Sequence, residues 1–165
     1  MKTLLLVRHA KSSWDDAATK DFDRPLNDRG KRNAPEMASR LVKKKVDVSL
    51  LVSSPAKRAK TTAILFSGEL KKKEGDIVFE KDLYQADADV FYSVISRIND
   101  KYDSVAVFSH NPGITDFANS LTEMRVDNIP TCGIFAVNIQ VEKWSEFAAG
   151  KKTFLFFDYP KSGSD

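Results

Sequence analysis

Residues 3–9 read Thr3-Leu4-Leu5-Leu6-Val7-Arg8-His9. The run from Thr3 to Val7 has the length and the continuous apolarity of a strand that is buried on both faces, as in a parallel sheet. Arg8 and His9 follow it directly, so two polar side chains stand at the carboxyl end of this strand. Open α/β sheets bind their ligands outside the carboxyl ends of their strands. We therefore expect a buried strand that leads into a functional site.

Outward from this strand, short apolar runs alternate with longer helical patterns, which is typical of an α/β domain. We expect further strands at residues 48–52, 76–80 and 104–108, helices at 27–44, 54–70 and 88–98, and a helix that opens at Asn111-Pro112. Asn27 and Asp87 are the predicted N-caps of two of these helices. Ser54 is the predicted cap after the second strand, with Pro55 at the first helical position.

The last third of the chain changes character. Residues 134–141 and 153–158 both resemble strands, and they predict an antiparallel pair at the edge of the sheet. The whole pattern predicts an α/β fold with three layers, α/β/α, and a mostly parallel, doubly wound sheet with an antiparallel C-terminal edge. We expect one domain over residues 1–160 and a polar tail at 161–165.

The composition excludes several classes of function. The 165 residues carry a formal net charge of +3, and the lysine runs at 43–45 and 71–73 favour a solvated surface over nucleic-acid binding. The single cysteine, Cys132, excludes an internal disulfide and a multi-cysteine metal site. No apolar run approaches the ~20 residues of a membrane span, and the run before Arg8 is too short for a secretory signal. We therefore expect a cytoplasmic protein with no membrane partner and no nucleic-acid partner.

Chemically useful side chains follow three of the predicted strands. The first strand leads to Arg8 and His9, the second to a helix with Arg58 in its first turn, and the fourth to His110. Arginine forks match phosphate oxygens bidentately, so two guanidiniums beside two imidazoles indicate a phosphoryl group as the ligand. Two histidines are too few for a zinc site. We therefore expect neither a metal nor another cofactor.

Four blocks in the chain resemble the histidine phosphatase superfamily, the group that includes the cofactor-dependent phosphoglycerate mutases. Within that superfamily, the short chain and its first block are most similar to the SixA-type phosphohistidine phosphatases. The resemblance implies a phosphoglycerate mutase-like fold and an open site, because the chain has no room for the insertions that cover the substrate in the larger mutases. The blocks are Arg8-His9-Ala10-Lys11-Ser12-Ser13-Trp14, Asp23-Arg24-Pro25-Leu26-Asn27 with Gly30, residues 53–63, and Ser109-His110-Asn111-Pro112-Gly113.

The resemblance also implies roles. His9 would attack phosphorus in line and form a phosphohistidine that water then hydrolyses. Arg8, Arg58 and His110 would bind the phosphoryl oxygens and stabilise the developing charge. Only neutral His9 can attack, so we expect a hydrogen bond from its other ring nitrogen to a backbone carbonyl. A protonated His110 would help most, and a buried carboxylate would be needed to offset the two arginines that oppose its protonation.

One position departs from the family pattern. Many members carry a glutamate after the third strand that protonates the leaving oxygen, and this chain has Gln85 in that region. Asp87 and Asp89 are nearby candidates for the general acid, although helix capping also accounts for Asp87. An ester leaving group needs acid assistance worth roughly 10² to 10⁴ in rate. A phosphohistidine can instead carry its own proton on the leaving imidazole, so Gln85 favours that substrate.

Three functions remain open from the sequence. The leading prediction is a protein phosphohistidine phosphatase that acts on a phosphotransfer domain. The second is a phosphatase of small phosphomonoesters. The third is a phosphate-binding module without turnover, against which the intact set of Arg8, His9, Arg58 and His110 argues, because binding alone needs no nucleophile.

Overall fold

The structure is a computed structural model that describes residues 1–161; residues 162–165 of the expected tail lie outside the described residues. Within this part of the chain, a six-stranded sheet has the order β3-β2-β4-β1-β5-β6. The pairs β3–β2, β2–β4 and β4–β1 are parallel, and β5 is antiparallel to both β1 and β6. The predicted sheet with its antiparallel edge is confirmed. The strands are β1 (Lys2–Arg8), β2 (Leu50–Ser53), β3 (Val78–Phe79), β4 (Ser104–Ser109), β5 (Ile134–Ile139) and β6 (Lys152–Asp158).

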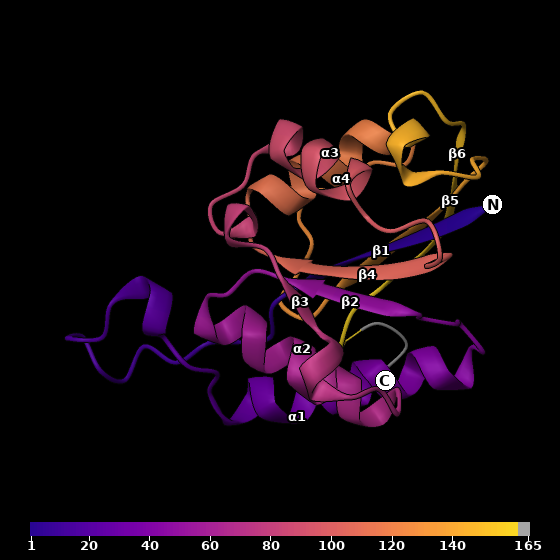
Figure 1. Ribbon diagram of the computed structural model, residues 1–165. Coiled ribbons are helices and arrows are strands. Elements are labelled where there is room, and N and C mark those ends of the chain that lie inside the picture. The colour runs from indigo at the N-terminus through magenta and orange to yellow at the C-terminus, as the bar shows by residue number, and fades with distance from the viewer. Residues whose placement is uncertain (162–165) are drawn as a thin grey trace.

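Helices cover both faces of the sheet (Figure 1). α1 (Asp28–Lys43) and α2 (Lys57–Glu69) lie on one face, and α3 (Ala88–Ser96) and α4 (Gly113–Leu121) lie on the other, so the three predicted layers are confirmed. Asn27 accepts a hydrogen bond from the backbone N–H of Gly30, and Asp87 accepts one from Val90, as expected of the two caps. No helix in residues 1–161 is long and apolar enough to cross a membrane.

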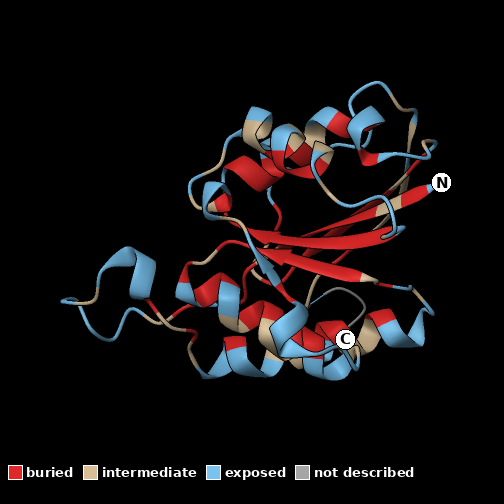
Figure 2. Cartoon of the chain, in the orientation of Figure 1, coloured by how far each residue is buried: buried red, intermediate tan, exposed pale blue. Residues whose placement is uncertain are grey.

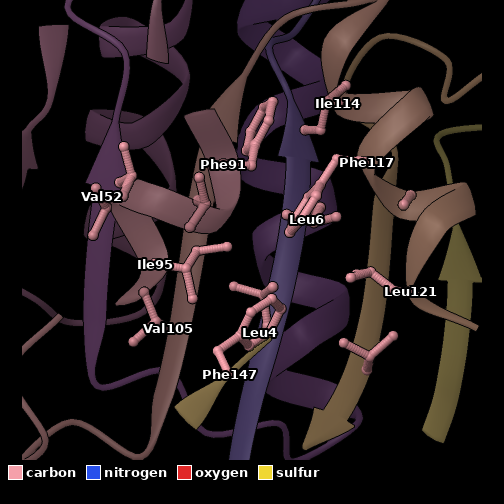
Figure 3. Close-up of a cluster of buried hydrophobic side chains, with 14 of the residues drawn as sticks. Leu4, Leu6, Val52, Phe91, Ile95, Val105, Ile114, Phe117, Leu121 and Phe147 are labelled. Carbon is pink, nitrogen blue, oxygen red and sulfur yellow. The ribbon is translucent and has the colours of Figure 1, made fainter. Parts of the chain in front are cut away.

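β1 separates two hydrophobic cores. Leu4 and Leu6 are fully buried on one face of the sheet, in a cluster with Phe91 and Phe117 (Figure 3). Leu5, which points the other way, joins the core under α1 and α2. The central strands are buried, whereas the helices are buried mainly where they face the sheet (Figure 2). Burial of each leucine side chain contributes about 1.5–3 kcal/mol, so this one strand helps to fix both outer layers.

Several predicted boundaries are wrong: β2 begins at Leu50 rather than at 48, β5 ends at Ile139 rather than at 141, and α3 ends at Ser96 rather than at 98. α2 begins at Lys57 and not at Ser54-Pro55, and no side chain caps it. The Ser54 hydroxyl instead accepts a hydrogen bond from the N–H of Ala56 and is hydrogen-bonded to the ring of His110. The hydroxyl that the sequence predicted as a helix cap therefore makes a tertiary contact. β3 is shorter than the predicted 76–80, because a 3-10 turn, η2 (Glu74–Asp76), comes before it.

The parallel strands β2, β4 and β1 bring their carboxyl ends to one edge of the sheet. The N–H of His9 donates to the carbonyl of Ser109 at 3.1 Å, and the N–H of Ser54 donates to the carbonyl of Phe108 at 2.9 Å. Backbone pairing therefore continues past the strand ends. It fixes the starting points of His9, Ser54 and His110 relative to one another.

Residues 12–26, which lie within the connection between β1 and α1, are here called the rim segment. It projects from the end of the molecule opposite the N-terminus (Figure 1), and most of it is exposed (Figure 2). It contains a short 3-10 helix, η1 (Asp21–Asp23), and Ser12 pairs with Leu26 at its base. A Cβ at Gly30 would lie 2.2 Å from the carbonyl oxygen of Lys11, so only glycine lets α1 start so close to this base.

Candidate active site

A pocket of about 550 Å³ lies where the carboxyl ends of β1, β2 and β4 meet. Arg8, His9, Arg58 and His110 all line it, so the structure brings the four predicted site residues together; these four are here called the pocket floor. The remaining lining residues are Lys11, Ser12, Trp14, Asp21, Arg24, Tyr84, Gln85, Asn111 and Thr131.

His9 is held as a neutral ring with a fixed tautomer. Its Nδ1–H donates to the carbonyl oxygen of Ala10 at 2.7 Å, which confirms the expected hydrogen bond to a backbone carbonyl. Burial above all, together with the charges of neighbouring groups, lowers the pKa of His9 to about 3. The lone pair is therefore on Nε2, which accepts a hydrogen bond from Nε of Arg58 at 3.4 Å. A neutral imidazole in this arrangement can act as a nucleophile.

His110 lies beside His9, with the two ring centroids 5.2 Å apart. Its Nε2 is hydrogen-bonded to the Ser54 hydroxyl at 2.8 Å, and among residues 1–161 its buried Nδ1 has no hydrogen-bond partner. Burial first, and then the charge of Arg58, lower the pKa of His110 to about 3. The carboxylate that faces it is Asp21, which is half exposed rather than buried and raises this pKa without offsetting the other effects.

The guanidiniums of Arg8 and Arg58 are held in place by backbone carbonyls. Arg8 Nη1 donates to the carbonyl of Ile129 at 3.0 Å, and Arg58 Nη1 donates to that of Asp21 at 2.7 Å. Burial and the nearby Arg58 lower the pKa of Arg8. Two fixed guanidiniums beside a neutral imidazole can bind the oxygens of a phosphoryl group and hold its phosphorus near a nucleophilic nitrogen.

A metal ion has no obvious place in the described part of the chain. Residues 1–161 hold no group of three or more His, Cys, Asp or Glu side chains that could bind one. Of the residues that line the pocket, Arg8, Lys11, Arg24 and Arg58 are cationic and only Asp21 is a carboxylate. This charge balance suits an anionic ligand rather than a cation.

The family model of the histidine phosphatase superfamily (branch 1) matches residues 4–91 of the chain, which include Arg8, His9 and Arg58. The chain belongs to this superfamily. The resemblance that the sequence blocks carried is thereby confirmed, and the cationic lining of the pocket agrees with it.

Relatives of this histidine phosphatase extend over most of the chain. An uncharacterised protein of Mycobacterium leprae is 29% identical over 169 residues, which cover 94% of this chain and 100% of that protein. Phosphoserine phosphatase 1 of Hydrogenobacter thermophilus is 30% identical over 105 residues, 62% of this chain and 47% of that protein. A structure of the protein histidine phosphatase SixA complexed with tungstate superimposes with a TM-score of 0.81 at 23% identity, over 96% of this chain and 97% of that one. The last match confirms the fold.

The mouth of the pocket contains two residues, Asp21 and Tyr84, that the sequence did not single out. Asp21 bonds to Arg58 and Arg24, each at 3.1 Å, and accepts a hydrogen bond from the Tyr84 hydroxyl at 2.6 Å. Arg24 stacks on Trp14, with 3.8 Å between the guanidinium carbon and the ring centroid. The block that begins at Asp23 indicated this region, but the contact between Asp21 and Tyr84 joins residues 63 positions apart, and no local pattern signals it.

The two candidate general acids lie elsewhere. Asp87 caps α3 through the N–H of Val90, and Asp89 is in the first turn of the same helix. Neither of them is among the residues that line the pocket, whereas Gln85 is. The structure therefore does not bring Asp87 or Asp89 together with the pocket floor.

Proposed function

We propose that this histidine phosphatase removes the phosphoryl group from phosphohistidine side chains, through a covalent phosphohistidine on its own His9. The observation that carries the proposal is the state of His9. Its proton is held on Nδ1 by the Ala10 carbonyl, and its Nε2 lone pair accepts a hydrogen bond from Nε of Arg58 at 3.4 Å. We assign this N–H of Arg58 to a phosphoryl oxygen once the substrate binds. The nucleophilic nitrogen of His9 and a guanidinium N–H that can bind an anion are therefore in direct contact.

The proposed reaction has two displacements. In the first, Nε2 of His9 forms a bond to phosphorus while the bond to the substrate's ring nitrogen breaks, and the electron pair goes to the leaving imidazole. Arg8, Arg58 and His110 bind the phosphoryl oxygens and stabilise the charge that spreads over them. In the second, the oxygen of water forms a bond to phosphorus while the bond from phosphorus to Nε2 of His9 breaks. The electron pair returns to Nε2, a proton of the water passes to the phosphate or to solvent, and His9 leaves as the neutral ring that Ala10 supports.

The choice of phosphohistidine as substrate rests on the proton donors at the pocket. The amide of Gln85 cannot supply a proton as a carboxylic acid does. The pKa of Asp21 is held well below its usual range, by the Tyr84 hydroxyl first and also by Arg24 and Arg58, so this carboxylate is ionised. A phosphohistidine with a proton on its second ring nitrogen leaves as neutral imidazole and needs no acid, whereas an alkoxide leaving group does.

The partner that we propose is a phosphorylated protein with a phosphotransfer domain. The mouth of the pocket suits a protein surface because Trp14, at 73% exposure, stands open to solvent there. Aromatic side chains of this kind are enriched in protein interfaces. We keep the cytoplasm as the expected location and expect no nucleic-acid or membrane partner, as the composition indicated.

A second candidate is a phosphatase of small phosphomonoesters. The observation that favours it is the 30% identity with phosphoserine phosphatase 1 over 105 residues. In that case a proton donor for the leaving oxygen has to enter from solvent or from the substrate.

The test measures phosphate release from a phosphohistidine-bearing phosphotransfer domain and from phosphoserine under the same conditions, with His9→Ala as the background. Fast release from the phosphohistidine domain alone supports the proposal. Release mainly from phosphoserine moves the function to small molecules and keeps the mechanism. Release from neither, with retained phosphate binding, favours the non-catalytic module.

A further inference from the structure

Asp21 is a carboxylate fixed at the mouth of the pocket. Oδ2 accepts hydrogen bonds from the hydroxyl of Tyr84 at 2.6 Å and from Nη2 of Arg58 at 3.1 Å, and Oδ1 accepts one from Nη2 of Arg24 at 3.1 Å. These donors come from three different parts of the chain: the rim segment itself, α2 and the loop after η3 (Lys81–Leu83). Asp21 is therefore held in one position with its negative charge facing the pocket.

The carboxylate has room for one more donor. An ionised carboxylate offers about four acceptor positions, and in the described part of the chain three side chains use Oδ1 and Oδ2 as acceptors. The side chain of Asp21 is 51% exposed and lines the pocket. A donor group on a bound substrate can therefore reach it.

Asp21 lies at the end of the pocket that the substrate's leaving group faces. His9 is at the floor, with 6% exposure, and an in-line displacement sends the leaving group away from the nucleophile. The leaving group therefore faces the mouth. A single guanidinium connects the two ends of this path, because Arg58 lies 3.4 Å from Nε2 of His9 through its Nε and 3.1 Å from Asp21 through its Nη2.

We propose that Asp21 determines specificity by accepting a hydrogen bond from the protonated second ring nitrogen of the leaving imidazole. This inference rests on phosphohistidine as the substrate. The nitrogen–phosphorus bond of the substrate breaks, its electron pair stays on the leaving nitrogen, and the ring departs neutral because the second nitrogen keeps its proton. Asp21 thus supports the substrate's phosphoimidazolium in the way that the Ala10 carbonyl supports the phosphorylated His9.

The same carboxylate discriminates against esters. An ester oxygen carries no N–H, and in the transition state it gains negative charge, which a fixed carboxylate repels. A charge-assisted hydrogen bond is roughly twice as strong as a neutral one. Asp21 therefore favours one class of leaving group and disfavours the other.

The test compares Asp21→Asn with wild type on phosphoimidazole and on para-nitrophenyl phosphate. We expect the ratio of the two kcat/KM values, phosphoimidazole over the ester, to fall by about tenfold in Asp21→Asn. If Asp21 only positions Arg58, both kcat/KM values fall together and the ratio stays constant, which overturns the inference. Asp23→Asn, in the same 3-10 helix but outside the pocket lining, is the matched control, and its ratio should not change.

A pH profile gives a second readout. The charged and titratable groups around Asp21 are Arg24, Arg58, Tyr84 and His110. The opposite charge of Asp21 favours the cationic form of the substrate ring. The pH at which kcat for phosphoimidazole begins to fall should therefore be about one unit higher in wild type than in Asp21→Asn.

The wild-type profile alone keeps the inference testable if Asp21→Asn does not fold. If kcat of the wild type falls on the alkaline side at a pH equal to or below the pKa of free phosphoimidazole, the role of Asp21 is overturned. Failure of the proposed function looks different: wild type then turns over para-nitrophenyl phosphate and neither phosphoimidazole nor the phosphohistidine domain.

Discussion

The pocket floor and the pocket mouth are built by different means. The floor residues His9 and His110 directly follow β1 and β4, and a backbone hydrogen bond from His9 to Ser109 continues the sheet beneath them. Both are 6% exposed. At the mouth, Asp21 and Trp14 belong to the exposed rim segment and are held by side-chain contacts, the first by Tyr84 and Arg58 and the second by Arg24.

This difference separates two tasks. Groups fixed by a sheet keep their geometry when loops change, so the floor suits the transfer of the phosphoryl group, which is common to every substrate. Groups fixed by side chains on a projecting segment can vary without loss of the fold, so the mouth suits the choice of leaving group. Arg58 belongs to both, because its Nε faces His9 and its two Nη atoms bind Asp21.

The largest expected effect is at the floor. His9→Ala should lower kcat by at least ~10⁴-fold on phosphohistidine and ester substrates alike, since the proposed covalent step has no other nucleophile. The variant should still fold, because the ring is hydrogen-bonded only to the carbonyl of its neighbour Ala10 and, at 3.4 Å, to Nε of Arg58. Steady-state phosphate release and thermal unfolding check both parts. Turnover that survives in a folded His9→Ala protein would remove His9 from the nucleophile role.

The next effect is at the residue that joins the two regions. Arg58→Ala should lower kcat/KM by roughly 10²- to 10³-fold, because a donor to the transferring phosphoryl group and the anchor of Asp21 are lost together. Arg58→Lys should recover little of this loss, since an ammonium cannot replace the guanidinium fork. Lys57→Ala, the exposed neighbour in α2, is the control. An unchanged kcat/KM in Arg58→Ala would place this side chain outside the reaction.

The same contrast explains how far the sequence could lead. Local sequence signals are sufficient where residues close together in the chain determine an element. The predicted strand at the start of the chain and the caps at Asn27 and Asp87 are accordingly confirmed. Because strand ends follow from strand positions, the convergence of His9 and His110 could be predicted as well.

Sequence reasoning failed where a distant partner decides the contact. Ser54 looked like a cap, yet its hydroxyl bonds to His110, 56 positions away. Asp21 and Tyr84 meet only because the rim segment and the loop after η3 both reach the mouth of the pocket, and no periodicity encodes that approach. The roles of Asp87 and Asp89 as general acids stay predictions, and in this structure neither residue lines the pocket.

A smaller effect concerns the stability of the floor as a function of pH. His9 and His110 have pKa values lowered to about 3 in the folded protein, against an ordinary value of 6.5. Below pH 6.5 the unfolded chain binds protons at these rings that the folded protein does not bind, so the free energy of unfolding should fall as the pH drops from 6.5 towards 3. Above 6.5 this contribution is constant.

Urea denaturation between about pH 7 and pH 5 measures this slope, for which each histidine supplies at most about 1.4 kcal/mol per pH unit. His110→Gln should have a shallower slope than wild type. Equal slopes would mean that the His110 ring titrates normally in the folded state. Changes at the mouth, such as Trp14→Ala, should leave the slope unaltered, because Trp14 carries no titratable proton in this range.

The smallest expected effect lies outside both regions, at Asp87. Its carboxylate caps α3 through the N–H of Val90 at 3.1 Å, so Asp87→Ala should lower the free energy of unfolding by about 1 kcal/mol with little change in kcat. Asp87→Asn separates the two roles that the sequence suggests for this residue, since asparagine caps a helix about as well as aspartate and cannot act as an acid. We expect wild-type stability and wild-type kcat on phosphohistidine and ester substrates for Asp87→Asn, measured by chemical denaturation and phosphate release. A selective loss of ester turnover in this variant would instead make Asp87 the proton donor and require α3 to move towards the pocket during catalysis.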